Sequence, residues 1–405
     1  MIKRSPDWLQ GRVVRRQFML PTRLPKEMVF KVAETRDEFE QALGLVYEAY
    51  LEQGLISSNQ QAQRFTKYHA FPYSTVIVGK WKDEVVATLM VIMDSPLGLP
   101  ADAGWDLEGI RGLGDRVAEI SSLAIKRGWR RRRGFILMPL VKFLYEYAVK
   151  YAGVDHFVAI TNQSARFFYR HILRFQDLDQ RLAGKSYQFV KTDRPWGMTL
   201  DLRRARKEFR RASVGKSDSR NIFRFFCERR FEGFQFPKRE FFKSFDSVLD
   251  AKVLQMFFCQ GPLSASDISD EDREFLRSVY HFNEFRKVIP PGLIPGRLDR
   301  KHPRFPVRIK GFLRGSTEAV SLPIEILEVS QRGLVIRAHE IQLSGFKMRL
   351  CFPISDQKTV ELEASPVWMK AGGLIGLKIS RITDGTWGSY IRYLEGSLRN
   401  RPKAE

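Results

Sequence analysis

The chain has 405 residues, of which 43% are hydrophobic, and its formal net charge is +22 at neutral pH. This length predicts about two to three domains with ordinary cores, and the charge favours an acidic partner: nucleic acid, an anionic membrane surface or an acidic carrier protein. Because no apolar run approaches the roughly 18 residues of a membrane helix and Met1–Arg16 lacks the apolar core of a secretory signal, we expect a cytoplasmic protein without a transmembrane segment, for which peripheral membrane contact stays open.

The chain begins with a basic stretch, residues 1–28, that shows no sustained hydrophobic period and is predicted to be an N-terminal arm. Val29–Glu34 is typical of a strand. Asp37–Glu52 is typical of an amphipathic helix, and Thr35 with Glu38 has the spacing of a capping box at its start.

Two apolar runs follow, Ser74–Trp81 and Val85–Asp94, and they predict strands joined by the short connection Lys82-Asp83-Glu84. Leu97–Arg116 is rich in Gly, Pro and Asp, which predicts an irregular loop.

The stretch from Glu119 to Gly153 changes its hydrophobic period partway. Glu119–Ile125 predicts a strand, whereas from Ile136 onward apolar residues recur at steps of three and four, which predicts a helix that Gly153 ends. The loop between them carries the residues Arg130, Arg131, Arg133 and Gly134. The first N–H groups of a helix lack partners and its dipole is positive there, so this loop is predicted to bind an anion such as a phosphate.

A further apolar run, His156–Ile160, precedes a motif made of Asn162, Tyr169 and Phe175. Tyr187–Val190 and Trp196–Leu202 then predict two closing strands.

The order strand, Arg131-x-x-Gly134-x-Ile136 loop, amphipathic helix, strand and Asn162…Tyr169…Phe175 resembles the GNAT superfamily of N-acyltransferases, over about residues 30–200. Within it, Glu119-Ile-Ser-Ser-Leu-Ala-Ile looks most like the bacterial N-acyl amino acid synthases and acyl-homoserine-lactone synthases, whose donors are acyl groups on acyl carrier protein. Ile136 stands where the family has a final Gly or Ala.

The resemblance implies an α/β fold with a mixed sheet and a role for each motif. Glu119 would orient or deprotonate the amine acceptor, and Tyr169 would protonate the departing thiolate. The main chain of Leu123 and Ile125 would pair with the amides of the pantetheine arm like an added strand, and Asn162 would contact that arm. The arginine loop would hold the phosphopantetheine phosphate and the carrier.

Each role has a plainer alternative. Glu119 is equally compatible with an exposed carboxylate paired with Arg116 at the strand start. Tyr169 is equally compatible with core packing, and Asn162 with capping the following helix.

Composition shifts after residue 202. Arg203–Arg230 is crowded with Arg, Lys and Phe, and Phe241–Phe258 and Asp270–Phe282 carry helical spacing, so residues 203–288 predict a basic, mainly helical extension. The interleaved aromatic and basic residues of 222–245 also fit nucleic-acid binding, but their spacing favours a packed helical layer.

The cysteines, Cys227, Cys259 and Cys351, show no metal spacing, and we expect reduced thiols and no metal site.

A turn-rich linker, residues 289–296, separates this extension from the last domain. Six short β-type runs then predict a small antiparallel barrel: Val307–Leu313, Ile324–Val329, Leu334–Ala338, Lys347–Phe352, Val360–Val367 and Gly373–Ile379.

Arg300-x-x-x-Arg304, then Glu328-x-Ser330-x-x-Gly333, then a late Trp368 resembles a PilZ domain, the bacterial receptor for cyclic di-GMP, over about residues 297–396. The resemblance implies that Arg300 and Arg304 clamp the phosphates and stack on guanine, and that Glu328, Ser330 and Gly333 face the guanine edges. Glu328 stands where the family has Asp or Asn. An unrelated small barrel preceded by a basic linker is the alternative.

The predicted organisation is an arm (1–28), a GNAT-like domain (29–202), the extension (203–288), the linker (289–296), a PilZ domain (297–396) and a tail (397–405). The two resemblances imply an enzyme without a permanently bound cofactor. It would transfer a fatty acyl group from a phosphopantetheine thioester, on acyl carrier protein or else on coenzyme A, to a small amine, with an amino acid as the favoured acceptor, and cyclic di-GMP would regulate the reaction. A catalytically silent cyclic di-GMP receptor and a basic nucleic-acid-binding protein are the two rival interpretations.

Overall fold

A computed structural model provides the structure of the protein. It describes residues 19–95, 97–111, 115–130, 134–178, 181–182, 187, 191, 195–246, 251–260, 268–280, 283–290, 302–314, 321–338, 348–370, 372–383 and 385–397.

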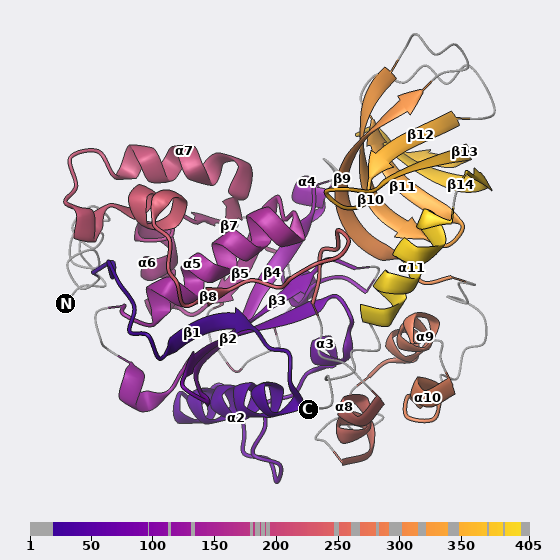
Figure 1. Ribbon diagram of the computed structural model, residues 1–405. Helices are drawn as coiled ribbons and strands as arrows, with labels where there is room; N and C mark the ends of the chain where they lie inside the picture. The colour runs from indigo at the N-terminus through magenta and orange to yellow at the C-terminus, as the bar shows by residue number, and fades with distance from the viewer. Residues whose placement is uncertain are drawn as a thin grey trace.

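The N-terminal half is built on a mixed sheet of eight strands in the order β6-β7-β5-β4-β3-β2-β1-β8 (Figure 1). The strands are β1 (Met28–Val32), β2 (Ser74–Trp81), β3 (Glu84–Met93), β4 (Val117–Ile125), β5 (His156–Thr161), β6 (Gln176–Asp177), β7 (Trp196–Asp201) and β8 (Phe234–Gln235). The pairs β4–β5 and β1–β8 are parallel, and the other neighbours are antiparallel.

Helices cover both faces of this sheet, with α2 and α5 on opposite sides (Figure 1). The helices of this half are α2 (Arg36–Glu52), α3 (Lys67–Ala70), α4 (Glu108–Arg111), α5 (Leu137–Tyr147), α6 (Gln163–His171) and α7 (Leu202–Ala212). The predicted capping box is present at α2, where Glu38 N–H donates to the Thr35 hydroxyl and the Glu38 carboxylate accepts from the Thr35 N–H. Gly153 ends the helical run in the left-handed conformation, as predicted.

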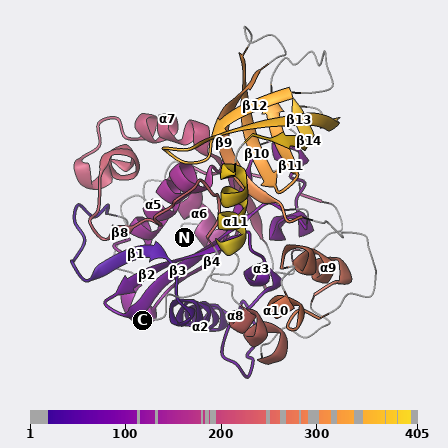
Figure 2. The same cartoon turned by 45° about the vertical axis from the view of Figure 1, so that its right-hand side comes forward.

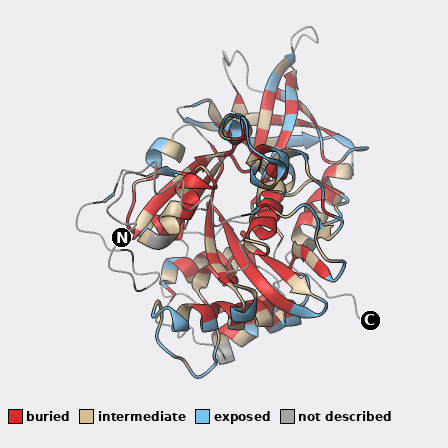
Figure 3. Cartoon of the chain, turned by 90° about the vertical axis from the view of Figure 1, so that its left-hand side faces the viewer, coloured by how far each residue is buried: buried red, intermediate tan, exposed pale blue. Residues whose placement is uncertain are grey.

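The central strands are buried on both faces, because both faces carry helices (Figure 3). In β3 every residue after Glu84 is buried, and in β2 the first six are. A sheet covered on both sides needs such continuous apolar strands, and the runs at residues 74–81 and 85–94 supply them.

The region after α7 is less helical than predicted. The helices are α8 (Ala251–Gln255), α9 (Asp270–Val279) and α10 (Asn283–Arg286), and they group below the barrel in Figure 2. Residues 241–246 are not helical, and β8 joins the edge of the sheet beside β1. The helical spacing of residues 241–246 was outweighed by contacts with the barrel, such as the hydrogen bond from the Phe242 N–H to the Ile354 carbonyl.

The phenylalanines of this region form core, as the sequence favoured. Phe225, Phe226, Phe231, Phe241 and Phe245 are all buried. Buried rings are not available to stack on bases, which removes the aromatic argument for nucleic-acid binding.

The last part of the chain is a closed barrel of six antiparallel strands, ordered β10-β11-β14-β13-β12-β9. The strands are β9 (Phe305–Arg314), β10 (Ser321–Ser330), β11 (Gly333–Ala338), β12 (Met348–Pro353), β13 (Thr359–Lys370) and β14 (Leu374–Ile382), followed by helix α11 (Thr386–Ser397). The predicted fold class, a mixed α/β sheet with a separate antiparallel barrel, is confirmed, whereas the extension between them is less helical than predicted. Within the described residues, no helix has the length and apolar character that crossing a membrane requires.

Candidate functional site

Strands β4 and β5 separate partway along their length. They pair from Val117 with His156 to Ile120 with Ala159, whereas β4 stays paired with β3 as far as Ile125. Among the described strands, the edge of β4 that faces β5 is therefore open from Ser121 onward. The backbone of Leu123 and Ile125 belongs to this stretch, and a ligand amide can add to such an edge as an extra strand does.

A bulge marks the point of separation. Ser122 has φ of +52°, a left-handed conformation that costs a non-glycine residue of order 1 kcal/mol or more. The register between β3 and β4 also shifts here, between Thr88 and Met90. Bulges next to a strand opening re-aim main-chain and side-chain groups.

Glu119 lies in β4 beside this opening and is only 1% exposed. Its carboxylate accepts hydrogen bonds from the Ala101 N–H, at 2.7 Å, and from the Tyr187 hydroxyl. The interpretation of Glu119 as an exposed carboxylate paired with Arg116 is wrong. Glu119 is buried, the Arg116 N–H donates to the Asp155 carboxylate, and the Arg116 side chain interacts with charged residues of the barrel.

Burial raises the pKa of Glu119 to about 8, with a smaller contribution from Asp102. The hydrogen bonds from Ala101 and Tyr187 act in the opposite direction. A carboxylate whose pKa lies near the working pH suits proton removal, since it is ionised often enough and remains basic enough to accept a proton.

Three tyrosines lie close to Glu119 and Arg64 lies close to two of them, and none of these residues was predicted as a site residue. Tyr50, Tyr68 and Tyr187 all lie within electrostatic reach of the carboxylate, and burial raises the pKa of each ring hydroxyl. The Arg64 guanidinium lies 5.2 Å from the centre of the Tyr50 ring. Arg64 and Tyr68 lie in residues 54–73, where polar and aromatic residues alternate, and this alternation is a sequence signal that could have indicated them.

This cluster holds a partly buried cation, Arg64, and a buried carboxyl, Glu119, and both interact electrostatically with Tyr50. Arg64 interacts electrostatically with Tyr50 and Tyr187, and both tyrosines also interact electrostatically with Glu119. Burial, together with the nearby Arg64, lowers the pKa of His69 to about 3, so that this histidine is neutral. The arrangement offers one group for a cation or amine and another for an anion.

The arginine loop lies between β4 and α5. Arg130 donates to the Ile125 carbonyl and pairs with Glu52, each at 2.5 Å, and its side chain is 28% exposed. Gly134 has φ of +85°, and its carbonyl accepts the first helical bond from Met138 N–H. Pro139 falls in the first turn of α5, where a missing N–H costs little. Arg131 and Arg133 lie outside the described residues.

Asn162 and Tyr169 belong to α6. Asn162 caps that helix by accepting from the Ala165 N–H at 2.9 Å. Tyr169 is buried, packs edge-on against Phe175 with 5.1 Å between ring centres, and interacts with Tyr50. Both plainer alternatives describe real contacts, and they leave the proposed roles open.

A narrow apolar cavity of about 20 Å³ joins Tyr169 to the opening beside β4. Its walls come from β4, α5, α6, β7 and α7, and they include Leu123, Leu144, Tyr169, Phe175, Phe209 and Phe226. The cavity has room for about one water molecule, so a longer apolar guest enters only by displacing these side chains.

The barrel carries a groove of about 340 Å³ at the β10–β11 turn. Arg304, Ser330 and Gly333 line it, together with Arg332, Trp368 and Lys378. The Arg304 guanidinium lies 3.5 Å from the Glu328 carboxylate, and the Ser330 hydroxyl donates to the Gly333 carbonyl at 3.1 Å. Four of the five predicted nucleotide residues are thus gathered here, and Arg300 lies outside the described residues.

Comparison with known proteins supports the assignment of the sheet domain. Residues 41–196 match the family model of the N-acyl amino acid synthase FeeM. No match is found among curated proteins.

Several solved structures are similar in part. FeeM, an N-acyl amino acid synthase from uncultured soil microbes, is 22% identical, with 44% of this chain and 93% of that chain covered and a TM-score of 0.37. The CoA-dependent acyl-homoserine lactone synthase BjaI is 12% identical, with 53% and 95% covered and a TM-score of 0.35. The Bacillus subtilis inhibitor of motility MotI/DgrA is 15% identical, with 27% and 59% covered and a TM-score of 0.22.

The family match covers β2 to β5 and α5, the elements that hold Glu119, the open edge of β4 and the arginine loop. The sheet domain, matched by the N-acyl amino acid synthase model over residues 41–196, is an acyltransferase.

Proposed function

We propose that the protein transfers a fatty acyl group from the phosphopantetheine arm of acyl carrier protein to the amine of an amino acid, in the cytoplasm and under the control of cyclic di-GMP bound to a PilZ-type barrel. The observation that carries the catalytic part is Glu119, a buried carboxyl with a pKa of about 8 beside the place where β4 leaves β5. Coenzyme A is the alternative donor.

The reaction proceeds by direct attack, without an acyl-enzyme. Glu119, directly or through a water molecule, takes the proton that the amine nitrogen loses as it bonds to the thioester carbon. The C–S bond then breaks, and the thiolate takes a proton from the Tyr169 hydroxyl, whose pKa burial raises so that it stays protonated until that step. Backbone N–H groups on the open edge of β4 stabilise the oxyanion.

The pantetheine arm would lie along β4 as an added strand, with its phosphate at the arginine loop and the N-terminus of α5. The acyl chain would enter the apolar cavity beside Leu123 and Tyr169 and displace its aromatic walls. The acidic carrier matches the formal charge of +22.

The acceptor would bind in the tyrosine cluster, with its amine at Glu119 and its carboxylate at Arg64. A zwitterion fits a site in which a carboxyl and a guanidinium share Tyr50 and Tyr187 as neighbours. An arginine is the residue type that holds a carboxylate by paired hydrogen bonds. An amino acid is therefore favoured over a simple alkylamine.

The proposed function is tested by incubating the full-length protein with acyl carrier protein bearing a labelled fatty acyl group and a mixture of amino acids. Mass spectrometry is expected to find one or a few N-acyl amino acids, with one free thiol released per product. A parallel reaction with acyl-coenzyme A decides the donor. If no amine is acylated from any donor, the protein is a silent receptor and the proposal is wrong.

Arg131→Ala is expected to raise KM for the acylated carrier by roughly 10-fold and to change kcat less than 3-fold, because a phosphate contact made equally in ground and transition states contributes to binding alone. Steady-state kinetics with varied carrier measure this. Arg127→Ala is the matched control, since this loop arginine has an 87% exposed side chain and its nearest acid is 3.9 Å away. A fall in kcat at unchanged KM would contradict the anchoring role.

Arg64→Gln is expected to raise KM for the amino acid by about 10- to 100-fold, because the acceptor carboxylate would lose a charged partner in a buried site. The same variant should lose little activity toward the corresponding amino acid amide, which lacks the carboxylate. Competition between acid and amide, followed by mass spectrometry, measures the preference. An unchanged preference would place the carboxylate elsewhere.

A further inference from the structure

The barrel meets the acyltransferase domain at one end of its sheet. At this end β2 begins at Ser74, β3 ends at Met93 and β4 begins at Val117. The residues just before β2 and β4, Tyr73 and Arg116, both make contacts that lead to the barrel. Glu119 is the third residue of β4, so these contacts lie close to the proposed base.

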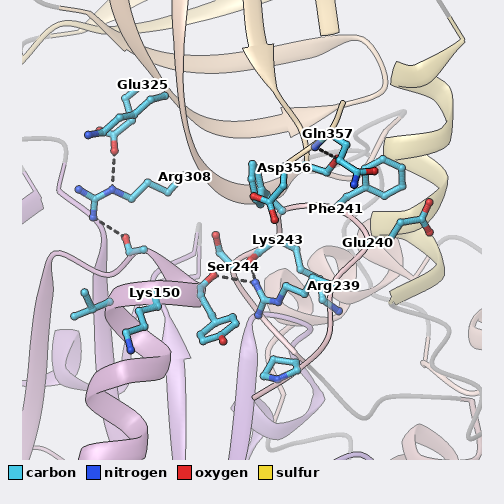
Figure 4. Close-up of a pocket in the computed structure, with 17 residues that line it drawn as sticks. Lys150, Arg239, Glu240, Phe241, Lys243, Ser244, Arg308, Glu325, Asp356 and Gln357 are labelled. Carbon is cyan, nitrogen blue, oxygen red and sulfur yellow. Dashed lines mark hydrogen bonds and ion pairs between the residues drawn. The ribbon is translucent and has the colours of Figure 1, made fainter. Parts of the chain in front are cut away.

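The first connection is an ion-pair bridge through Arg308. Side chains of β9 alternate between the barrel interior and its surface, and Arg308 is on the outside. Its guanidinium lies 2.7 Å from Glu325 of β10 and 2.7 Å from Asp155, and it donates to the Gly153 carbonyl at 3.2 Å. Figure 4 shows Arg308 reaching from below Glu325 toward the acyltransferase domain.

Asp155 carries this bridge to the catalytic strand. One oxygen of the carboxylate faces Arg308, and the other accepts from the Arg116 main-chain N–H at 2.9 Å. A single buried side chain, 1% exposed, therefore links the barrel to the residue before β4.

The Arg116 side chain is buried in this junction, since the residue is only 9% exposed to solvent. None of the described residues accepts a hydrogen bond from its two terminal nitrogens. Burial and the nearby Arg308 lower the pKa of Arg116 to about 10, while Asp155, Glu325 and Glu328 oppose this change. The charge on Glu328, the partner of the groove residue Arg304, thus acts on Arg116 at the start of β4.

The second connection runs through Arg304, which has two separate partners. Its guanidinium pairs with Glu328 in the groove, and its main-chain carbonyl accepts a hydrogen bond from the Tyr73 hydroxyl at 2.5 Å. The next residue, Phe305, stacks on Phe245 with 6.4 Å between ring centres. A change at the guanidinium therefore acts on a residue whose backbone is held by the other domain.

Tyr73 lies two strands away from Glu119. Its carbonyl accepts from the Met93 N–H at 3.0 Å. The neighbouring Ser74 pairs with Ile92, and Ile92 pairs with Glu119 across β3 and β4. A shift of Tyr73 is passed on through hydrogen-bonded strands, which are stiff elements.

We propose that the bond between Tyr73 and the Arg304 carbonyl is the contact through which ligand binding in the barrel groove changes acyl transfer at Glu119. This inference rests on the proposed function of the groove. A ligand phosphate that draws the Arg304 guanidinium away from Glu328 moves the Arg304 main chain, and Tyr73 moves with it or loses its bond. Both changes alter the end of the sheet at which Glu119 lies.

There is room for such a movement beside the junction. A cleft of about 780 Å³ lies between the barrel and the acyltransferase domain, next to Arg308. Lys150, Arg239, Lys243 and Asp356 line it from both sides, as Figure 4 shows. Two domains beside an open cleft can change their angle by a small amount, while the contacts that join them, such as the stacking of Phe305 on Phe245, adjust.

The test uses the full-length protein and the variant Tyr73→Phe, which removes one hydroxyl and keeps the ring. Cyclic di-GMP binding is measured by calorimetry, and acyl transfer is measured with and without saturating nucleotide. Tyr280→Phe is the matched control, because this buried tyrosine also bonds to a main-chain carbonyl, that of Ala70 at 3.1 Å, but comes from the helical region and not from the barrel.

In the wild-type protein and in Tyr280→Phe, saturating nucleotide is expected to change kcat/KM by roughly 5-fold or more. In Tyr73→Phe, the nucleotide is expected to bind with a Kd within about 3-fold of wild type, while the change in kcat/KM falls below 2-fold. An equal response of Tyr73→Phe and wild type overturns the inference, as does a wild-type protein that binds the nucleotide without response. Absence of nucleotide binding to the wild-type protein overturns the proposed function of the groove as well.

Discussion

Glu119→Gln is expected to lower kcat/KM for acyl transfer by about 10²- to 10⁴-fold, the usual contribution of a positioned base. Glutamine keeps the shape and still accepts from the Ala101 N–H, so the loss reports proton transfer and not a collapsed site. Steady-state rates with a saturating acylated donor measure it. A variant with more than a third of wild-type activity would show that Glu119 is not the base.

The pH dependence gives this prediction a second readout. Because burial raises the pKa of Glu119 to about 8, wild-type kcat/KM should rise as pH passes through about 8 and level off above it. The Gln variant should lack this rise. Glu38→Gln is the matched control, since Glu38 is buried too but its hydrogen bonds and the nearby lysines lower its pKa, opposing burial, and the profile should keep its shape.

The same shift predicts the stability of the variant. The pKa of Glu119 is higher in the folded state, about 8, than in the unfolded chain, near the ordinary 4.5, so between these values the folded state binds more protons than the unfolded state. The free energy of unfolding therefore falls as pH rises through this window. Its slope is at most on the order of 1.4 kcal/mol per pH unit, and the total change is a few kcal/mol. At pH 8 to 9 Glu119→Gln should melt at a higher temperature than wild type and transfer far more slowly. A base kept at the expense of stability is what an active site shows.

Arg300→Ala combined with Arg304→Ala is expected to weaken cyclic di-GMP binding by about 100-fold or more and to leave basal transfer measurable. Two arginines that each hold a phosphate contribute charge-assisted hydrogen bonds of roughly 1.5–3 kcal/mol apiece, and the loss of both brings the affinity down accordingly. In the structure Arg304 pairs only loosely with Glu328, at 3.5 Å, so its guanidinium is available for a ligand.

Calorimetric titration of the full-length protein measures this loss. Arg314→Ala is the matched control, since Arg314 is also a barrel arginine, 42% exposed, but pairs with Glu361 and does not line the groove. Titration curves that are the same in the double variant and the control would show that the nucleotide does not bind at Arg300 and Arg304.

Because Glu328 has one methylene more than the Asp or Asn of the resembled motif, Glu328→Asp is a useful companion variant. It is expected to bind cyclic di-GMP at least as tightly as the wild-type protein.

Secondary structure and fold class could be predicted from the sequence wherever a local pattern was strong. Six short β-type runs predicted the barrel, and the observed strands enclose them apart from Lys347, which lies outside the described residues, and Gly373, which precedes β14. Apolar steps of three and four, with Gly153 at the end, predicted α5. Prediction was wrong for residues 241–246, where aromatic residues at helical spacing form an irregular segment because they contact the barrel, as in the hydrogen bond from the Phe242 N–H to the Ile354 carbonyl.

By itself the sequence determined which residues could do chemistry: a carboxyl at the start of a central strand, an arginine loop before a helix, and a barrel motif of arginine, carboxylate and serine. Only the tertiary structure decided the burial, the pKa and the contacts of those groups. Burial raises the pKa of Glu119, and the hydrogen bonds from Ala101 and Tyr187, which lie far apart in the chain, limit this rise. Tyr73 and Arg304 lie 231 residues apart and share no periodic pattern. Periodicity reports which side of an element faces a core. Burial, hydrogen-bond partners and contacts between domains arise only when distant segments pack together, and they set the pKa of Glu119 and join the barrel to the sheet that carries it.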